Sequence, residues 1–313
     1  MKVAVIGIGG VGGYFGGRLC QLLNCQSDLE IHFIARGQHL PEIQKNGLRL
    51  DTDEGEMTCR PTSATDAFAD LPELDFVMIG VKSYDLDSIL TRLEEKITEK
   101  TTILPLLNGV DIYERIRRKI KTGVVFPACV YIGAQIERPG KVTQRGGLCT
   151  IIFGKDPAKD RIDERIFELF TQAGIKHQWH EDPFAEIWSK FIFVAPFSLV
   201  TARFDKTIGE LLASQKLSSV VKNIMREIES VARKKGIALP ENIAETSFEK
   251  ARGFPFESKT SFQRDYENTN KPDERDIFGG AIIRMAEQLG IAVHTTQEIY
   301  QSLQTKKRQK ARL

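Results

Sequence analysis

The chain has 313 residues, a hydrophobic fraction of 41%, a charged fraction of 27% and a formal net charge of +2. This length favours two domains, and the composition is that of an ordinary soluble globular protein. A balanced charge gives no support for nucleic-acid binding, and the basic stretch 306–312 is typical of a solvated chain end. No apolar run approaches the roughly twenty residues of a membrane span, and the first residues enter a strand rather than a signal peptide. We therefore expect a cytoplasmic protein without membrane or nucleic-acid partners.

The cysteines and histidines predict neither a disulfide framework nor a metal site. The five cysteines lack any C-x-x-C spacing, so we expect reduced thiols. His177 and His180 are three residues apart, but no further ligand pattern accompanies them, and we interpret them as structural or surface residues. The cysteines are Cys20, Cys25, Cys59, Cys129 and Cys149.

The first seventeen residues, MKVAVIGIGGVGGYFGG, carry the clearest motif. An apolar run at 3–6 predicts a strand buried on both faces, and a helix-like stretch follows the glycines. Gly7, Gly9 and Gly12 have the G-x-G-x-x-G spacing of a dinucleotide-binding loop, which also includes Gly10. In such a loop the three glycines permit a tight turn, backbone approach to a pyrophosphate, and close packing of helix on strand. The helix N-terminus would then bind the pyrophosphate. A glycine-rich turn without a ligand is the weaker alternative.

The end of the second predicted strand, 29–34, indicates which coenzyme is bound. An NAD site places an acidic residue there to accept hydrogen bonds from the ribose 2′-hydroxyl. This strand is followed instead by Ala35-Arg36-Gly37, and a guanidinium suits a 2′-phosphate. The sequence therefore predicts NADP, with an ordinary surface arginine as the alternative.

Two further predicted strands, 74–81 and 101–107, are followed by polar residues. Lys82 follows the first and Asn108 the second. Ligands of open α/β sheets bind at the carboxyl ends of strands, so both side chains are candidates for the coenzyme crevice. The alternatives are a solvated lysine and, for the Asn-Gly pair, ordinary turn chemistry.

The remaining pattern predicts two domains. A hairpin is expected within 48–61, strands at 123–132, 140–143, 149–153 and 174–179, and a helix at 161–170. From about residue 183 the periodicity is helical, with helices at 186–194, 217–235 and 277–289, the last two ended by glycine. We therefore expect a Rossmann-type, doubly wound α/β domain at 1–181 and an all-helical substrate domain at 182–313.

Lys190 lies in the apolar stretch Trp188–Val194 near the start of the helical domain. A lysine there either extends its aliphatic stem to solvent or loses water around its ammonium group, which weakens its hold on the proton. The second possibility suits a general acid.

Two polar clusters lie farther along the chain. The hydroxyls of Ser258 and Ser261 could hold a substrate carboxylate or cap a helix. Asp273 and Glu274 have the pattern of acids in a first helical turn, a role that is compatible with a catalytic one.

Together these pieces resemble the ketopantoate reductases, also called 2-dehydropantoate 2-reductases. The resemblance covers nearly the whole chain in the family's order: VIGIGGVGGYFGGRL, IARG, GVKSYD, LLNGV, the W-x-K of Trp188 and Lys190, and SFQRD…DERDIFGG around Ser261 and Glu274. The glycine and arginine parts are generic, whereas the W-x-K and the paired polar motifs are specific. The resemblance implies reduction of ketopantoate to pantoate by NADPH, in pantothenate biosynthesis.

The resemblance also implies residue roles. Lys190 would protonate the alkoxide that forms at the C2 ketone, and its positive charge would stabilise the transition state. Ser261, with Ser258, would bind the substrate, and Glu274 would orient coenzyme or substrate hydroxyls. Asn108 and Lys82 would close the coenzyme side, and Asn108 would also contact the substrate.

Three departures from the family pattern leave the identity of the oxo acid open. The family usually has asparagines four and eight residues after the lysine, where this chain has Val194 and Ser198, and Ile208 replaces a further one. Ser198 stays a candidate substrate contact, whereas valine cannot hydrogen-bond a substrate hydroxyl. One extra residue before Glu274 makes Asp273 an alternative functional acid.

Two other functions therefore stay open. One is reduction of a different, less polar 2-oxo acid on the same scaffold, and the other is a non-catalytic dinucleotide-binding sensor. The apolar helical domain also allows a homodimer, while the sequence says nothing about regulation.

Overall fold

The computed structural model describes residues 1–267 and 272–310, with side chains up to residue 305. It divides into two compact units, unit 1 (Met1–Pro183) and unit 2 (Phe184–Leu313). The boundary expected at 181/182 lies two residues before this division.

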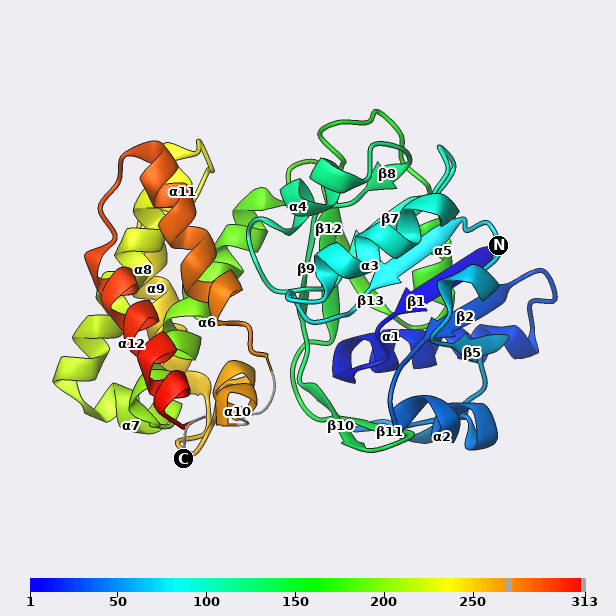
Figure 1. Cartoon of the computed structure of the whole chain (residues 1–313), viewed down its shortest axis with the longest axis horizontal. Helices are drawn as coiled ribbons and strands as arrows, with labels where there is room; N and C mark the ends of the chain where they lie inside the picture. The colour runs from blue at the N-terminus through cyan, green and yellow to red at the C-terminus, as the bar shows by residue number, and fades with distance from the viewer. Residues whose placement is uncertain (268–271, 311–313) are drawn as a thin grey trace. The chain divides into compact units, whose positions relative to one another are not determined.

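Unit 1 is built on a six-stranded parallel sheet with the strand order β5-β2-β1-β6-β7-β8 (Figure 1). From β1 the chain moves outward through β2 to β5, then returns to β6 and continues outward on the other side. The strand order thus reverses between β1 and β6, which is where open α/β sheets bind their ligands. The strands are β1 (Lys2–Ile6), β2 (Glu30–Ile34), β5 (Ser63–Thr65), β6 (Phe76–Ile79), β7 (Thr102–Pro105) and β8 (Val124–Val125).

A second sheet, of order β10-β11-β3-β4, packs on the first helix, α1 (Gly10–Cys20). Because α1 contacts strands of both sheets, side chains on it have little room: a Cβ on Gly10 would lie 2.3 Å from Ala134 O, and one on Gly13 would lie 2.7 Å from Val142 Cγ2. This packing explains why α1 contains more glycine than the dinucleotide motif requires. The strands are β3 (Leu48–Thr52), β4 (Gly55–Cys59), β10 (Ala134–Arg138) and β11 (Lys141–Gln144).

A third sheet, of order β13-β12-β9, and four more helices complete unit 1. Three single 3-10 turns, at Gln21–Asn24, Phe68–Asp70 and Glu94–Lys96, link these elements. The elements are β9 (Ala128–Tyr131), β12 (Thr150–Gly154), β13 (Lys176–His180), α2 (His39–Asn46), α3 (Leu86–Leu93), α4 (Ile112–Lys119) and α5 (Arg165–Gln172).

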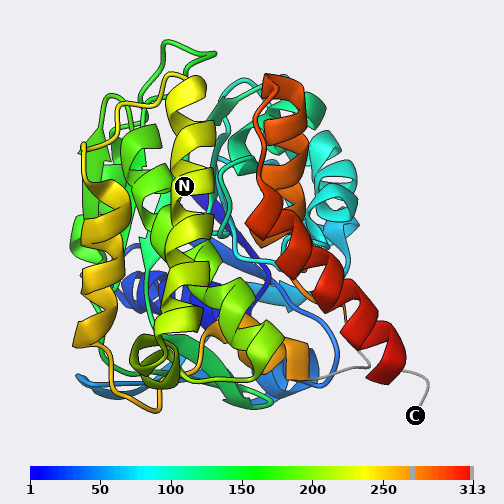
Figure 2. The ribbon, with the colours of Figure 1, turned by 90° about the vertical axis from the view of Figure 1, so that its left-hand side faces the viewer.

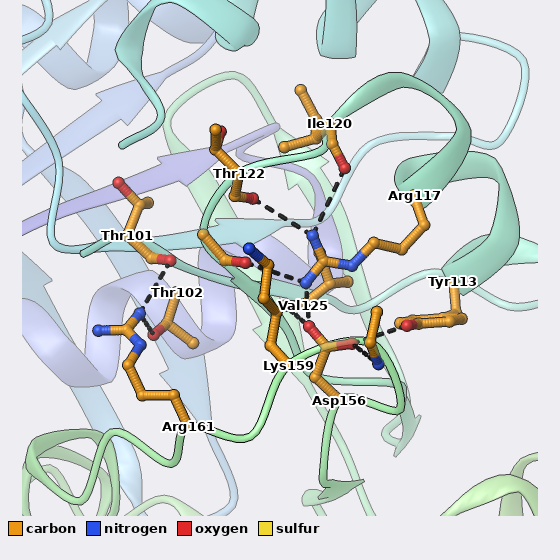
Figure 3. Close-up of polar contacts among 12 residues, drawn as sticks. Thr101, Thr102, Tyr113, Arg117, Ile120, Thr122, Val125, Asp156, Lys159 and Arg161 are labelled. Atoms are coloured by element: carbon orange, nitrogen blue, oxygen red, sulfur yellow. Dashed lines mark hydrogen bonds and ion pairs between the residues drawn. The ribbon is translucent and has the colours of Figure 1, made fainter. Parts of the chain in front are cut away.

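A buried polar cluster around Asp156 joins α4, β8 and β12 (Figure 3). Asp156 is 1% exposed; its carboxylate pairs with Arg117 and accepts hydrogen bonds from Tyr113 Oη at 2.7 Å and Val125 N at 2.8 Å. Burial, together with the hydrogen bond to Asp156, raises the pKa of Tyr113 to about 12. Breaking a buried ion pair by removing one partner costs about 3–5 kcal/mol. Removing either Arg117 or Asp156 alone is therefore expected to destabilise unit 1.

Unit 2 is helical, and its described residues include no strand. The helix α6 contacts α8, α9, α10 and α12, so it forms the centre of the unit. Figure 2 shows α8 (yellow-green) and α12 (red) on the side of this unit that faces the viewer. The helices are α6 (Phe184–Phe204), α7 (Ile208–Ala213), α8 (Gln215–Lys234), α9 (Ile243–Lys250), α10 (Ser261–Glu267), α11 (Ala281–Leu289) and α12 (His294–Lys310), with a 3-10 turn at Ala251–Gly253 and a π turn at Asp276–Gly280.

The α6 helix corrects two expectations. It spans 21 residues instead of the predicted 186–194, because it continues through Pro196 into the core of unit 2. Its length and hydropathy reach those of a membrane span, contrary to the expectation that no such run exists. However, 61% of its most apolar window is buried inside the protein, as in the core helix of a globular domain. Length and composition alone are therefore weak evidence for a membrane span here.

The general architecture confirms the predicted fold class, a Rossmann-type domain followed by a helical one. The hairpin within 48–61 is β3 and β4. The strand expected at 123–132 is broken at Pro127, which has no N–H to donate, into β8 and β9 of two different sheets. The β10 strand was not predicted because it is short and has only two apolar residues, and four of its five residues are exposed. The helix expected at 161–170 begins only at Arg165.

Candidate coenzyme and substrate sites

The glycine loop connects β1 to α1 with the geometry that its motif predicts. Gly7 has φ +91°, in the left-handed region, and its N–H donates to Ile34 O at 2.9 Å. A Cβ on Gly12 would lie 2.1 Å from Gly7 O, so only glycine permits this approach of helix to turn. On the other side, a Cβ on Gly80 would lie 3.1 Å from Gly12 Cα. The turn and the close packing are thus properties of the fold itself.

Gly9 differs from these glycines. It precedes α1 in an extended conformation, with φ −89° and ψ −157°, which any residue can adopt. The nearest atom to a Cβ on Gly9 would be Gly80 O, at 4.0 Å, so packing does not require glycine there. The first turn of α1 carries no acidic residue, and no side chain caps it. The position therefore has the space and the backbone donors that a pyrophosphate needs.

Arg36 follows β2 by two residues, and its guanidinium pairs with the Asp85 carboxylate, with 2.5 Å between Nη2 and Oδ2. The arginine side chain is 74% exposed, whereas that of Asp85 is 23% exposed. Asp85 follows β6, so this pair joins the segments beyond the two strands that flank β1. Arg36 thus lies in a region of the sheet where a coenzyme phosphate could reach it.

Lys82 and Asn108 follow β6 and β7, respectively, and both are half-buried. Because β1, β6 and β7 are parallel neighbours, their carboxyl ends lie at one edge of the sheet, together with the glycine loop. Asn108 is followed by Gly109, with φ +128°, so the turn chemistry of the Asn-Gly pair is present. The structure therefore gathers the candidate coenzyme residues of unit 1, namely Gly7, Gly9, Gly10, Gly12, Arg36, Lys82 and Asn108, at one sheet edge.

In unit 2, one stripe of α6 is less buried than the rest of the helix. Lys190, Phe193 and Val194 are half-buried, while residues 195–202 are fully buried. Residues three and four apart share a helix face, so the lysine is followed on its own face by two apolar side chains. Phe193 stacks on Phe254, with 5.5 Å between the ring centroids, and Phe254 is 47% exposed. We call Lys190, Phe193, Val194 and Phe254 the lysine stripe.

The other candidate substrate residues are placed differently. Ser198 is 1% exposed, and its Oγ has no hydrogen-bond partner among the described residues. It lies inside the protein, which does not suit the direct substrate contact expected of it. Ser258 is half-buried and Ser261 exposed. Ile208 N donates to Ser258 O at 2.9 Å, so the segments around these two residues, which are distant in the sequence, lie side by side.

The segment before α10 is also connected to α6. Thr260 Oγ1 accepts from Gln263 N at 3.1 Å, which caps the start of α10, and lies 3.0 Å from Thr201 Oγ1 of α6. The capping that was considered for the serines is thus performed by Thr260, and Ser261 opens the helix.

The structure separates the two acids before the π turn. Asp273 forms an ion pair with Arg275 at 2.6 Å and accepts from Arg275 N at 3.1 Å. Arg275 in turn donates to Leu303 O at 3.1 Å, so Asp273 belongs to a structural bridge to α12. Glu274 is 6% exposed. The described residues include no group of three or more His, Cys, Asp or Glu side chains that could hold a metal ion.

Sequence reasoning missed two features of these sites. Asp85 lies within the motif GVKSYD but was assigned no role. Its position, six residues after a strand that flanks the glycine loop, was a visible signal. Sequence reasoning also missed Phe254, whose contact with Phe193 joins residues 61 positions apart, which no local pattern indicates.

Comparison with known proteins agrees with this geometry. The family model Ketopantoate reductase PanE/ApbA matches residues 3–157, and Ketopantoate reductase PanE/ApbA C terminal matches residues 184–307. The chain is 27% identical to an uncharacterized oxidoreductase, YkpB, of Bacillus subtilis, over 97% of this chain and 98% of that protein. The crystal structure of 2-dehydropantoate 2-reductase from Porphyromonas gingivalis W83 has a TM-score of 0.83 and 31% identity, over 97% and 99% of the two chains.

A more distant structure shares the fold alone. D-mandelate dehydrogenase, in a ternary structure with NADH and anilino(oxo)acetate, has a TM-score of 0.84 at 19% identity, over 99% of each chain. The two family models together match well over half of the chain, in the order in which its motifs occur. The chain therefore belongs to the ketopantoate reductase family of oxidoreductases, as those motifs predicted.

Proposed function

We propose that this protein is a cytoplasmic, NADPH-dependent reductase that converts ketopantoate to pantoate in pantothenate biosynthesis. The observation that carries the proposal is the placement of Lys190, a half-buried lysine beside half-buried apolar side chains on a mostly buried, apolar helix. An ammonium group among half-buried apolar side chains moves less freely, and is less screened by water, than one on an exposed surface. Both properties suit a group that must stabilise and protonate an oxyanion.

We call the sheet edge of unit 1 that carries the glycine loop, Arg36, Lys82 and Asn108 the coenzyme edge. Its residues fit NADPH. Backbone N–H groups at the start of α1 would hold the pyrophosphate, with Gly9 leaving room for it. Arg36 would hold the 2′-phosphate, and Lys82 and Asn108 would bind nearer the nicotinamide. When bound, NADPH supplies the hydride that adds to C2 of the oxo acid.

The residues of unit 2 would act on the substrate. Lys190 Nζ donates a proton to the C2 oxygen as negative charge develops there, an interaction that is stronger in the transition state than in the ground state. The hydroxyls of Ser258 and Ser261 hydrogen-bond the substrate carboxylate. Glu274, the acid that the family resemblance implies, orients hydroxyl groups of the substrate or coenzyme, while Asp273 pairs with Arg275.

The direct test is oxidation of NADPH by the purified protein with ketopantoate, compared with NADH as the reductant. Saturable turnover that prefers NADPH supports the proposal. If NADPH binds but no 2-oxo acid is reduced, the protein is a dinucleotide sensor and the proposal is wrong. Preference for NADH would refute the coenzyme assignment while leaving the reductase class in place.

A second candidate function is reduction of a 2-oxo acid with an apolar substituent, and the lysine stripe favours it. Val194 offers no hydrogen bond, and Phe193 with Phe254 presents a partly exposed aromatic surface on the same face as Lys190. Ketopantoate carries a hydroxyl group that would gain nothing from these side chains. The same assay distinguishes the candidates if it includes the analogue of ketopantoate that lacks this hydroxyl. Faster turnover of the analogue would favour the second candidate.

A further inference from the structure

Asp85 occupies a helix-capping position but does not cap. It directly precedes α3, where an aspartate usually accepts a hydrogen bond from a backbone N–H of the first turn. Here its backbone has the αR conformation, with φ −89° and ψ −15°, and its side chain makes no capping hydrogen bond. The carboxylate is directed instead to Arg36, across the end of β1. The usual structural reason for an aspartate at this position is therefore absent.

The Arg36–Asp85 pair lies where the protein would contact the adenosine ribose of a bound coenzyme. Arg36 occupies the position, after the second parallel strand, that discriminates a 2′-phosphate from a 2′-hydroxyl. In this protein, that arginine already has a carboxylate as hydrogen-bond acceptor. A 2′-phosphate must displace the carboxylate from the guanidinium, or bind beside it against like-charge repulsion. A 2′-hydroxyl, in contrast, can donate a hydrogen bond to the same carboxylate.

We propose that Asp85 is a coenzyme-selecting residue that holds Arg36 and lowers the protein's preference for NADPH over NADH. The inference rests on the proposed function, in which a nicotinamide dinucleotide binds at the glycine loop. Arg36 and Asp85 then act as one unit, with the arginine favouring the phosphate and the aspartate opposing it. The protein is thereby expected to accept both coenzymes, with a modest preference for NADPH.

The test is the variant Asp85→Asn, with dissociation constants measured for NADPH and NADH and for the fragments adenosine 2′,5′-bisphosphate and AMP. Removing one charge whose partner is exposed to solvent changes affinity modestly, so we expect NADPH to bind roughly three- to tenfold more tightly at low salt. We expect the same gain for the bisphosphate. Affinity for NADH and AMP should stay the same or fall.

The matched control is Asp87→Asn on the same helix. Asp87 pairs with Arg115 at 3.2 Å and is 77% exposed, so this variant removes the same charge close by without releasing Arg36. It should leave the ratio of the two dissociation constants unchanged. If Asp85→Asn unfolds at a lower temperature than the wild type, the same dissociation constants are measured for Asp85→Ser, because serine also suits a helix-capping position.

The outcomes separate this inference from the proposed function. An unchanged NADPH to NADH ratio in both Asp85 variants overturns the inference, while coenzyme binding and turnover would still support the reductase. An equal change in Asp85→Asn and Asp87→Asn also overturns it, because the effect would then be one of net charge. Failure of the wild-type protein to bind either coenzyme would refute both.

Discussion

The coenzyme edge of unit 1 and the lysine stripe of unit 2 are built from different materials. At the coenzyme edge, the shape is set by backbone: Gly7 turns in the left-handed region, and Gly12 packs against Gly7 O. On the lysine stripe, the shape is set by side chains, with Phe193 and Val194 beside the one cation of that face. We therefore expect the first arrangement to accept any pyrophosphate and the second to discriminate among substrate substituents.

This difference indicates where specificity can change. A backbone cradle tolerates few substitutions, because a Cβ on Gly7 or Gly12 would lie 3.0 Å or less from backbone atoms and one on Gly9 would fill the space proposed for the pyrophosphate. A stripe of half-buried side chains can be exchanged one residue at a time without disturbing the buried side of α6. We therefore expect changes at the coenzyme edge to abolish binding, and changes on the stripe to alter the choice of substrate.

The largest effect is expected from alanine in the glycine loop. Gly12→Ala places a methyl group 2.1 Å from Gly7 O, so α1 must shift. Overpacking of this kind costs about 1–3 kcal/mol or more, and coenzyme binding should be lost. Thermal unfolding and coenzyme titration measure the two effects.

Gly9→Ala is the matched variant. Its methyl group meets no atom of the protein closer than 4.0 Å, so stability should stay within about 0.5 kcal/mol of wild type while coenzyme binding is lost. If Gly9→Ala binds NADPH normally, the pyrophosphate does not approach this residue and the backbone cradle is wrongly placed.

Lys190→Ala comes next. Loss of a general acid reduces turnover by roughly a hundredfold or more, and the affinity for NADPH should change little, because the role proposed for Lys190 is toward the oxo acid. The measurements are kcat and the affinity for NADPH of Lys190→Ala. Lys190→Arg, which keeps the positive charge, is measured alongside it. Turnover close to wild type in Lys190→Ala would remove this residue from the mechanism.

Arg36→Ala is expected to have a smaller, selective effect. Loss of a charge-assisted hydrogen bond to a 2′-phosphate should weaken NADPH binding roughly tenfold, with little change for NADH. Equal losses for both coenzymes would mean that Arg36 supports the loop instead of reading the phosphate.

The fold of the coenzyme edge, a glycine turn between a buried strand and a helix of a parallel sheet, was predictable because its sequence signals are local. The glycine spacing, the strand before it and Arg36 all lie within the first 36 residues, and the parallel sheet follows from alternating strands and helices. Even so, the motif does not reveal a second requirement for glycine at position 10, which is that β10 packs directly on it. The exposed, charged β10 was itself missed.

The substrate residues were harder to predict because their environment depends on contacts between distant segments. Ser198 was expected to contact the substrate, but the continuation of α6 into the core buries it. Asp273 and Glu274 are adjacent in the sequence, which gives no sign of the ion pair that Asp273 forms with Arg275. Periodicity shows which face of a helix is apolar, but it does not show which neighbours cover that face.

The smallest expected effect tests the stripe itself. Val194→Asn restores an amide on the face of α6 that carries Lys190, one helical turn away. If the apolar stripe selects the substrate, this amide should raise kcat/KM for ketopantoate relative to its analogue without the hydroxyl, by roughly three- to tenfold, which corresponds to one new hydrogen bond. Val194→Leu, which has a side chain of about the size of asparagine without a polar group, is the control for packing. A loss of activity with both substrates in equal proportion would mean that Val194 supports the helix and that specificity is set elsewhere. An unchanged ratio, with activity retained, would mean that the hydroxyl of ketopantoate is recognised by other residues, and the polar substrate would then be compatible with this apolar face.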